Sequence, residues 1–210
     1  MFYIVKTPRW IKNFFSDSVW HIDKSQKSIY LTFDDGPHPQ ITPFVLDELA
    51  RYNAKATFFC IGKNVSEHPD IFKQILKQEH AVGNHTHNHL NGWKIQNEKY
   101  LQNILEARNF IDSDLFRPPY GKITSSQVKI LKRLEKPFKI IMWSVLSGDF
   151  DINISPEKCL KNVLKHTGSG SVIVFHDSEK AYERLRYALP AMLKYFSEKG
   201  YRFEKISIEL

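Results

Sequence analysis

Two adjacent aspartates, Asp34 and Asp35, stand in the stretch LTFDDGP (31–37), directly after an apolar run and directly before a Gly-Pro turn. Like charges on neighbouring residues repel one another, so this pair calls for a compensating positive charge. A bound divalent cation supplies one and makes two adjacent carboxylates tolerable. Because successive side chains of a strand point in different directions, one carboxylate can bind the metal while its neighbour addresses the water on that metal.

Imidazoles that suit the same metal follow another short apolar run. The stretch GNHTHNHL (83–90) contains His85, His87 and His89. The spacing of His85 and His89 suits two ligands on one helical turn or in a tight loop, and His87 between them should point elsewhere. Two imidazoles with a carboxylate and an open fourth position form a catalytic zinc site, and the aspartate pair supplies the carboxylate. A solvated His-rich turn is the alternative.

Further polar residues fall at the ends of other strand-like runs. Arg117 and Tyr120 follow LF, Trp143 and Asp149 end or follow FKIIM, and His176 ends SVIVF. The C-terminal ends of parallel strands form one face, at which active sites are built, so we expect these side chains to meet. The alternatives are a structural salt bridge for Arg117, a loop cap for Asp149, a turn for His176 and the core for Trp143.

The elements that must position these residues alternate along the chain. Strand-like runs lie at 28–33, 56–62, 81–84, 115–120, 138–145, 170–177 and 201–206. Helix-like runs lie at 42–53, 69–79, 98–111, 125–135, 155–166 and 179–199. We expect Thr42 and Ser155 to begin helices, and Pro190 to break or kink the last one. Near-continuous apolar strands between helices predict a parallel sheet covered by helices in one domain, either a compact barrel or an open doubly wound sheet.

Composition describes an ordinary globular protein with a basic surface. Of 210 residues, 42% are hydrophobic and 25% charged, with a net charge of +7. That charge attracts anionic partners, but no dense Lys/Arg run suggests nucleic acid. We expect Cys60 and Cys159 to be buried free thiols.

The start of the chain lacks the pattern of a signal peptide, because Lys6, Pro8, Arg9 and Lys12 break its apolar stretches. A cytoplasmic location is therefore expected. No apolar run is long enough for a transmembrane segment. We expect residues 1–27 to form an N-terminal extension packed on the domain, with peripheral membrane contact through this basic, aromatic segment as the alternative.

With these residues laid out, the chain resembles the polysaccharide deacetylase family, also called the NodB-homology family or carbohydrate esterase family 4. The resemblance runs from about Ser28 to Glu204. The motifs that carry it appear in order as TFDDGP (32–37), HTHNH (85–89), FRPPYG (116–121), WSVLSGDF (143–150) and VFH (174–176). Any one motif is a weak signal, but the ordered set is a strong one. It implies a distorted (β/α)7 barrel for residues 28–210, which agrees with the strand-like runs.

The resemblance also implies a role for each residue. Asp34 would be the general base, paired with Arg117, and His176 the general acid, its pKa raised by Asp149. The metal ligands would be Asp35, His85 and His89, and the backbone N–H of Tyr120 would stabilise the oxyanion. Trp143, Phe150 and Val174 would line the pocket for the acetyl methyl. Trp93, in the loop after the histidines, either stacks on a sugar ring or packs.

The implied activity is metal-dependent removal of acetyl groups from N-acetylated sugars of a peptidoglycan-like or chitooligosaccharide-like glycan by a monomer. Zinc is the expected metal, with cobalt or another first-row ion also suitable. Leu146 stands where many relatives carry an acid, Phe150 where they carry tryptophan and Val174 where they carry leucine, so the pocket differs in shape. The alternatives are an O-acetyl esterase acting on xylan, a non-catalytic glycan-binding or metal-binding protein, and a deacylase of lipid-linked or nucleotide-linked sugars.

Overall fold

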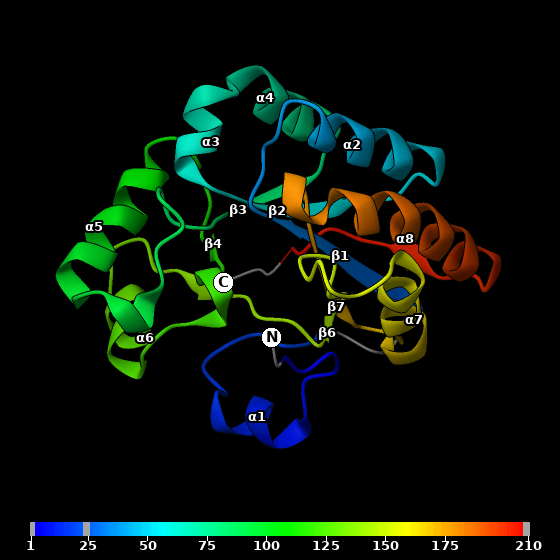
Figure 1. The fold of residues 1–210 in the computed structure, drawn as a ribbon. Helices are drawn as coiled ribbons and strands as arrows, with labels where there is room; N and C mark the ends of the chain where they lie inside the picture. The colour runs from blue at the N-terminus through cyan, green and yellow to red at the C-terminus, as the bar shows by residue number, and fades with distance from the viewer. Residues whose placement is uncertain (1–2, 23–25, 208–210) are drawn as a thin grey trace.

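Parallel strands form the centre of the fold and helices surround them (Figure 1). The structure is a computed structural model that describes residues 3–22 and 26–207. Its strands are β1 (Ser28–Asp34), β2 (Ala56–Cys60), β3 (Ala81–Asn84), β4 (Leu115–Phe116), β5 (Lys139–Ile140), β6 (Val145–Leu146), β7 (Val172–His176) and β8 (Arg202–Phe203). Its helices are α1 (Arg9–Phe14), α2 (Ile41–Arg51), α3 (Gly62–Glu67), α4 (Pro69–Lys77), α5 (Asn97–Arg108), α6 (Ser125–Lys132), α7 (Pro156–His166) and α8 (Glu179–Glu198), with short 3-10 turns at Gly92–Lys94 and Pro119–Gly121.

The strand order is that of a barrel. Neighbouring strands pair in the order β5-β4-β3-β2-β1-β7-β6, every one of these pairs is parallel, and β8 pairs with the start of β1. If β5 and β6 were joined, this order would be the cyclic order of the chain itself, as in a (β/α) barrel. The expected distorted (β/α)7 barrel is confirmed, and the open doubly wound alternative is wrong.

The prediction of one strand at 138–145 is wrong, because this run forms two separate strands. The run at 138–145 crosses from one edge of the sheet to the other and forms β5 at its start and β6 at its end. The N-terminal segment, residues 3–22, supplies hydrogen-bond partners to the residues between β5 and β6. Met142 N donates to Val19 O over 2.8 Å, and Ser144 O accepts from Thr7 N over 3.0 Å. Residues near the start of the chain therefore fill the gap in the barrel wall.

The core lies between the sheet and the outer helices. The rings of Phe33, Phe58 and Phe175 stack across β1, β2 and β7, with centroids 5.1 and 6.2 Å apart. Helix α8 packs against α2 and α7. Cys60 and Cys159 are buried free thiols, as predicted. Among residues 3–22 and 26–207, no helix combines the length and the apolar character that a membrane crossing requires.

Helix boundaries follow the sequence signals only in part. Ser155 caps α7 as expected, because its Oγ accepts a hydrogen bond from Lys158 N. Thr42 does not cap α2, which begins one residue earlier, and its hydroxyl bonds to Asp177 instead. The sequence predicted a break or a kink at Pro190, and helix α8 runs through this residue without a break. Its buried face continues on both sides of the proline, and this packing outweighs one missing backbone hydrogen bond.

Candidate active site

The C-terminal ends of the strands bring the predicted residues together. Asp34 ends β1 and His176 ends β7, and the two residues are partners in the parallel register. His85 directly follows β3, and Arg117 directly follows β4. The polar residues that stand far apart in sequence therefore share one end of the barrel.

Asp35, His85 and His89 form a cluster that suits a divalent metal. One ligand atom from each of the three residues lies within 4.8 Å of the other two. Asp35 Oδ1 lies 3.7 Å from His85 Nε2 and 3.2 Å from His89 Nε2. His87 points away, as predicted, with its ring against Phe110.

The ligand atoms of this cluster suit zinc in their chemical type and in their protonation state. His85 Nδ1 is 2.7 Å from the carbonyl oxygen of Arg117, which leaves the Nε2 lone pair facing Asp35. Burial lowers the pKa of His85 to about 4, so the imidazole is neutral as a ligand must be. Burial raises the pKa of Asp35, but the surrounding imidazoles, His89 first, outweigh it and hold the pKa below its usual range. Asp35 Oδ1 is buried and receives no hydrogen bond within the described residues, as expected of an atom reserved for a cation.

Asp34 and Arg117 form a buried ion pair beside this cluster. Arg117 Nη1 donates to Asp34 Oδ1 over 2.7 Å, and the Arg117 side chain is fully buried. The same guanidinium donates to Thr32 Oγ1 and to the carbonyl oxygens of Ile141 and Met142 over 2.7 to 3.1 Å. Because all its nitrogen atoms are engaged, the guanidinium holds one oxygen of Asp34 in a fixed position.

His176 pairs with an acidic side chain, whereas Asp34 pairs with a basic one. Its Nδ1 lies 2.8 Å from Asp149 Oδ1, and its backbone N–H donates to Asp149 Oδ2 over 2.7 Å. Burial lowers the pKa of His176, but the Asp149 carboxylate outweighs burial and raises the pKa to about 10. Asp149 is itself fixed, because Arg184 Nε donates to its backbone oxygen over 2.6 Å. This raised pKa favours the protonated form of His176 near neutral pH.

Tyr120 lies in the short turn after β4, close to the metal ligands. Its backbone is left-handed, with φ 59°. Its ring is 4.6 Å from the ring of His89, centroid to centroid. Tyr120 and Gly121 of this turn line the cavity that the cluster faces.

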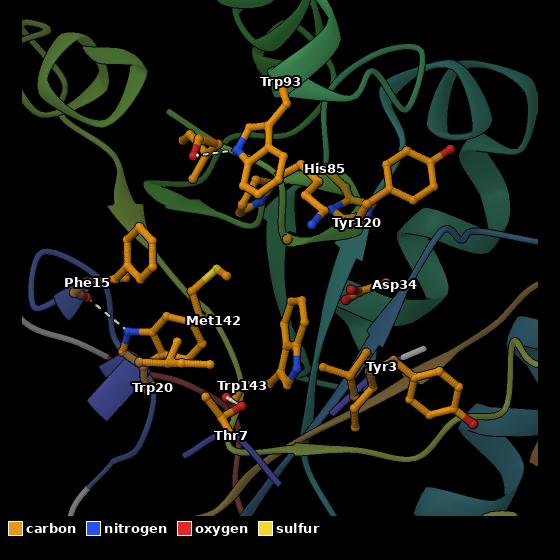
Figure 2. Close-up of a pocket in the computed structure, with 18 of the residues that line it drawn as sticks. Tyr3, Thr7, Phe15, Trp20, Asp34, His85, Trp93, Tyr120, Met142 and Trp143 are labelled. Atoms are coloured by element: carbon orange, nitrogen blue, oxygen red, sulfur yellow. Dashed lines mark hydrogen bonds between the residues drawn. The ribbon is translucent and has the colours of Figure 1, made fainter. Parts of the chain in front are cut away.

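A cavity of about 780 Å³ opens over the cluster. Figure 2 shows Asp34, His85 and Tyr120 on one side of it and Trp143 beneath them. The predicted pocket residues Trp143, Phe150 and Val174 all line this cavity.

The N-terminal segment also contributes to the cavity wall, which the sequence did not predict. Its contributing residues are Tyr3, Ile4, Thr7, Ile11, Phe15, Asp17, Ser18 and Trp20. Thr7 and Trp20 are tied down, because Thr7 Oγ1 donates to Trp143 O over 2.9 Å and Trp20 Nε1 to Phe15 O over 3.0 Å (Figure 2).

Trp93 lines the same cavity in a fixed orientation. Its Nε1 donates to Ile123 O over 3.0 Å, and Lys122 Nζ lies 3.9 Å from the centre of its ring. The indole is more than half exposed. One face is thus covered by a lysine, and the rest of the ring is open to a ligand.

The sequence also missed the groups that surround the turn after Asp34. Asn64 Nδ2 donates to Asp35 O over 2.7 Å, Asp177 Oδ1 accepts from Gly36 N over 3.0 Å, and Ser178 Oγ lies 3.4 Å from Asp35 Oδ2. One feature of the sequence could have indicated Asp177. It directly follows a buried apolar strand, and an acid in such a place requires hydrogen-bond partners.

Comparison with known proteins agrees with this geometry. A family model described as polysaccharide deacetylase matches residues 21–138. A peptidoglycan-N-acetylglucosamine deacetylase of Bacillus cereus is 37% identical over 194 residues, which cover 90% of each chain. A chitooligosaccharide deacetylase of Azorhizobium caulinodans is 32% identical over 198 residues, which cover 81% of this chain and 90% of that protein. The crystal structure of the Bc1960 peptidoglycan N-acetylglucosamine deacetylase superposes with a TM-score of 0.84 at 32% identity and covers 95% of each chain. With its motifs, its barrel and its relatives in agreement, this chain belongs to the polysaccharide deacetylase family.

Proposed function

We propose that this protein hydrolyses the acetamido group of N-acetylated sugars in a glycan related to peptidoglycan or chitooligosaccharides, with the help of a divalent metal. One observation carries the proposal. A carboxylate paired with an arginine and an imidazolium paired with a carboxylate stand beside an Asp-His-His cluster in one cavity. The relatives named as peptidoglycan and chitooligosaccharide deacetylases support the substrate class.

Asp35, His85 and His89 would hold the metal, and zinc suits this donor set best. When bound, such a metal lowers the pKa of water and polarises a carbonyl oxygen. The remaining chemistry belongs to the residues around the cluster.

Asp34 acts as the base and takes a proton from the attacking water with the carboxylate oxygen that Arg117 leaves free. The backbone N–H of Tyr120 donates to the carbonyl oxygen as negative charge develops on it, an interaction worth about 3 kcal/mol in comparable sites. His176 then gives its proton to the nitrogen as the C–N bond breaks. The products are acetate and a free amine, so water is added across the amide.

The apolar pocket wall supports an acetyl group as the acyl part of the substrate. Trp143, Phe150 and Val174 present apolar surface to the cavity, and burial of a methyl group there is favourable. Trp93 offers an indole beside the same cavity, where the apolar face of a sugar ring stacks.

The test is acetate release from N-acetylglucosamine oligomers, peptidoglycan fragments and acetylated xylan, with zinc-loaded wild type and the Asp34→Asn variant. We expect release from an N-acetylated substrate and a loss of about a hundred- to ten-thousand-fold in the variant. Release from xylan alone would assign the protein as an esterase. An Asp34→Asn variant as fast as wild type would contradict the proposed base.

A further inference from the structure

The turn that carries Asp35 has an unfavourable backbone conformation. Asp35 has φ 82°, in the left-handed region. This region is unfavourable for an L-residue, so surrounding contacts hold it. The conformation turns Asp35 out of the line of β1, where Asp34 is the last residue, and toward His85 and His89.

Three contacts hold the backbone of this turn. Asn64 Nδ2 donates to Asp35 O over 2.7 Å, and Ile61 N donates to Gly36 O over 2.9 Å. The third contact is the hydrogen bond of 3.0 Å from Gly36 N to Asp177 Oδ1. It is the one made by a charged side chain, and it acts on the peptide unit directly after Asp35.

Asp177 is held from several directions. Its side chain is buried, its Oδ2 accepts from Thr42 Oγ1 over 2.5 Å, and its backbone N–H donates to Asp34 O over 3.1 Å. Thr42 Oγ1 in turn accepts from His38 N over 2.8 Å. The carboxylate therefore links the turn to the start of α2 and to the end of β7.

Gly36 makes this approach possible. A Cβ atom at this position would lie 2.1 Å from Asp177 Oδ2, far inside van der Waals contact. The glycine of the DDGP stretch is thus the residue that lets a buried carboxylate approach the backbone beside Asp35.

A buried acid close to the Asp35 carboxylate is costly for folding alone. Burial and the nearby Asp35 raise the pKa of Asp177 to about 7. A neutral side chain would avoid this cost, which favours a role for the carboxylate in the site rather than in stability.

We propose that Asp177 is a positioning residue, whose carboxylate holds the Gly36 N–H and so aims the Asp35 carboxylate at the site shared with His85 and His89. The inference rests on the proposed function for the identity of that site as a metal site. Asp177 acts through Asp35 and takes no part in proton transfer.

Zinc affinity of the full chain tests this inference without a turnover assay. Competition with a chromophoric chelator gives the Kd for wild type, Asp177→Ala, Thr42→Val and the control Glu48→Gln, which changes a buried acid on α2 that pairs with Arg51. We expect Asp177→Ala, which removes the acceptor of the Gly36 N–H, to weaken zinc binding by about 10- to 100-fold, the usual effect of removing an outer partner of a ligand. Thr42→Val should weaken it less, because Asp177 keeps its bond to Gly36, and Glu48→Gln should leave it unchanged.

Circular dichroism of the metal-free variants shows that each is folded. A folded Asp177→Ala variant with wild-type zinc affinity would overturn the inference and leave the proposed function intact. Equal weakening by Glu48→Gln would also overturn it, because the effect would then be one of stability. Wild-type protein that binds no zinc would contradict the proposed metal site itself and the inference with it. If Asp177→Ala does not fold, Thr42→Val decides, and unchanged affinity there counts against the inference.

Discussion

The roles proposed for Asp34 and His176 follow from the nearest charged neighbour of each side chain. Asp34 faces a buried guanidinium, and His176 faces a buried carboxylate. The first pairing suits a group that accepts a proton, and the second suits a group that donates one. Neither role could be assigned from residue type alone, because both types serve as acid or base in other sites.

Replacement of His176 by alanine should separate amide from ester hydrolysis. Without a proton, the nitrogen would leave as an amide anion, which is a much poorer leaving group than an alkoxide. His176→Ala should therefore lower the rate on an N-acetylated sugar much more than on an O-acetylated one. Initial rates of acetate release on matched substrates measure the ratio. Equal losses on both substrates would argue against His176 as the proton donor.

The His176–Asp149 pair should also make stability depend on pH. The folded-state pKa of His176 is raised from 6.5 to about 10. The stabilisation is therefore fully present below about pH 6.5 and is lost as the pH rises through 10. Urea unfolding of metal-free protein across this range should show a falling free energy of unfolding. In Asp149→Asn the decrease should be smaller, and identical pH dependence in the two proteins would contradict the pairing.

Among the elements, the regular βα units were predictable and the interrupted ones were not. Strands β1, β2 and β7 are continuous apolar runs between clear helices, so pattern alone placed them. The run at 138–145 is equally apolar, yet it splits into β5 and β6, because its middle pairs with the N-terminal segment rather than with one neighbouring strand. Such a choice depends on contacts between distant parts of the chain, which local sequence does not record.

The N-terminal segment should contribute to stability through its buried residues only. Trp20 is buried, packs in the cluster around Phe116 and Met142, and lines the cavity. Trp20→Ala should therefore lower the free energy of unfolding by about 3 kcal/mol or more. Trp10, on the same segment, is 69% exposed, so Trp10→Ala should change it by less than about 0.5 kcal/mol. Denaturant unfolding measures both, and similar values for the two variants would contradict this placement of the segment.

For the whole molecule, the site exists because a barrel places five strand ends at one rim. The motif residues were predictable, since their types and order carry the chemistry and the family resemblance. The residues that support the motif residues were less predictable. Asn64 and Asp177 act by hydrogen bonds to the backbone at Asp35 and Gly36, and residue types alone do not reveal such bonds. The apolar wall from the N-terminal segment likewise depends on where the barrel is open.

The central claim is that one metal held by Asp35, His85 and His89 is required for deacetylation. The most direct measurement adds zinc stepwise to chelator-stripped protein and follows bound zinc and acetate release from an N-acetylglucosamine oligomer in the same samples. We predict no release without zinc, and release that rises with bound zinc and saturates at one ion per chain. The His89→Ala variant should lose zinc binding and acetate release together. Full activity of stripped protein, or zinc binding that His89→Ala leaves unchanged, would contradict the account.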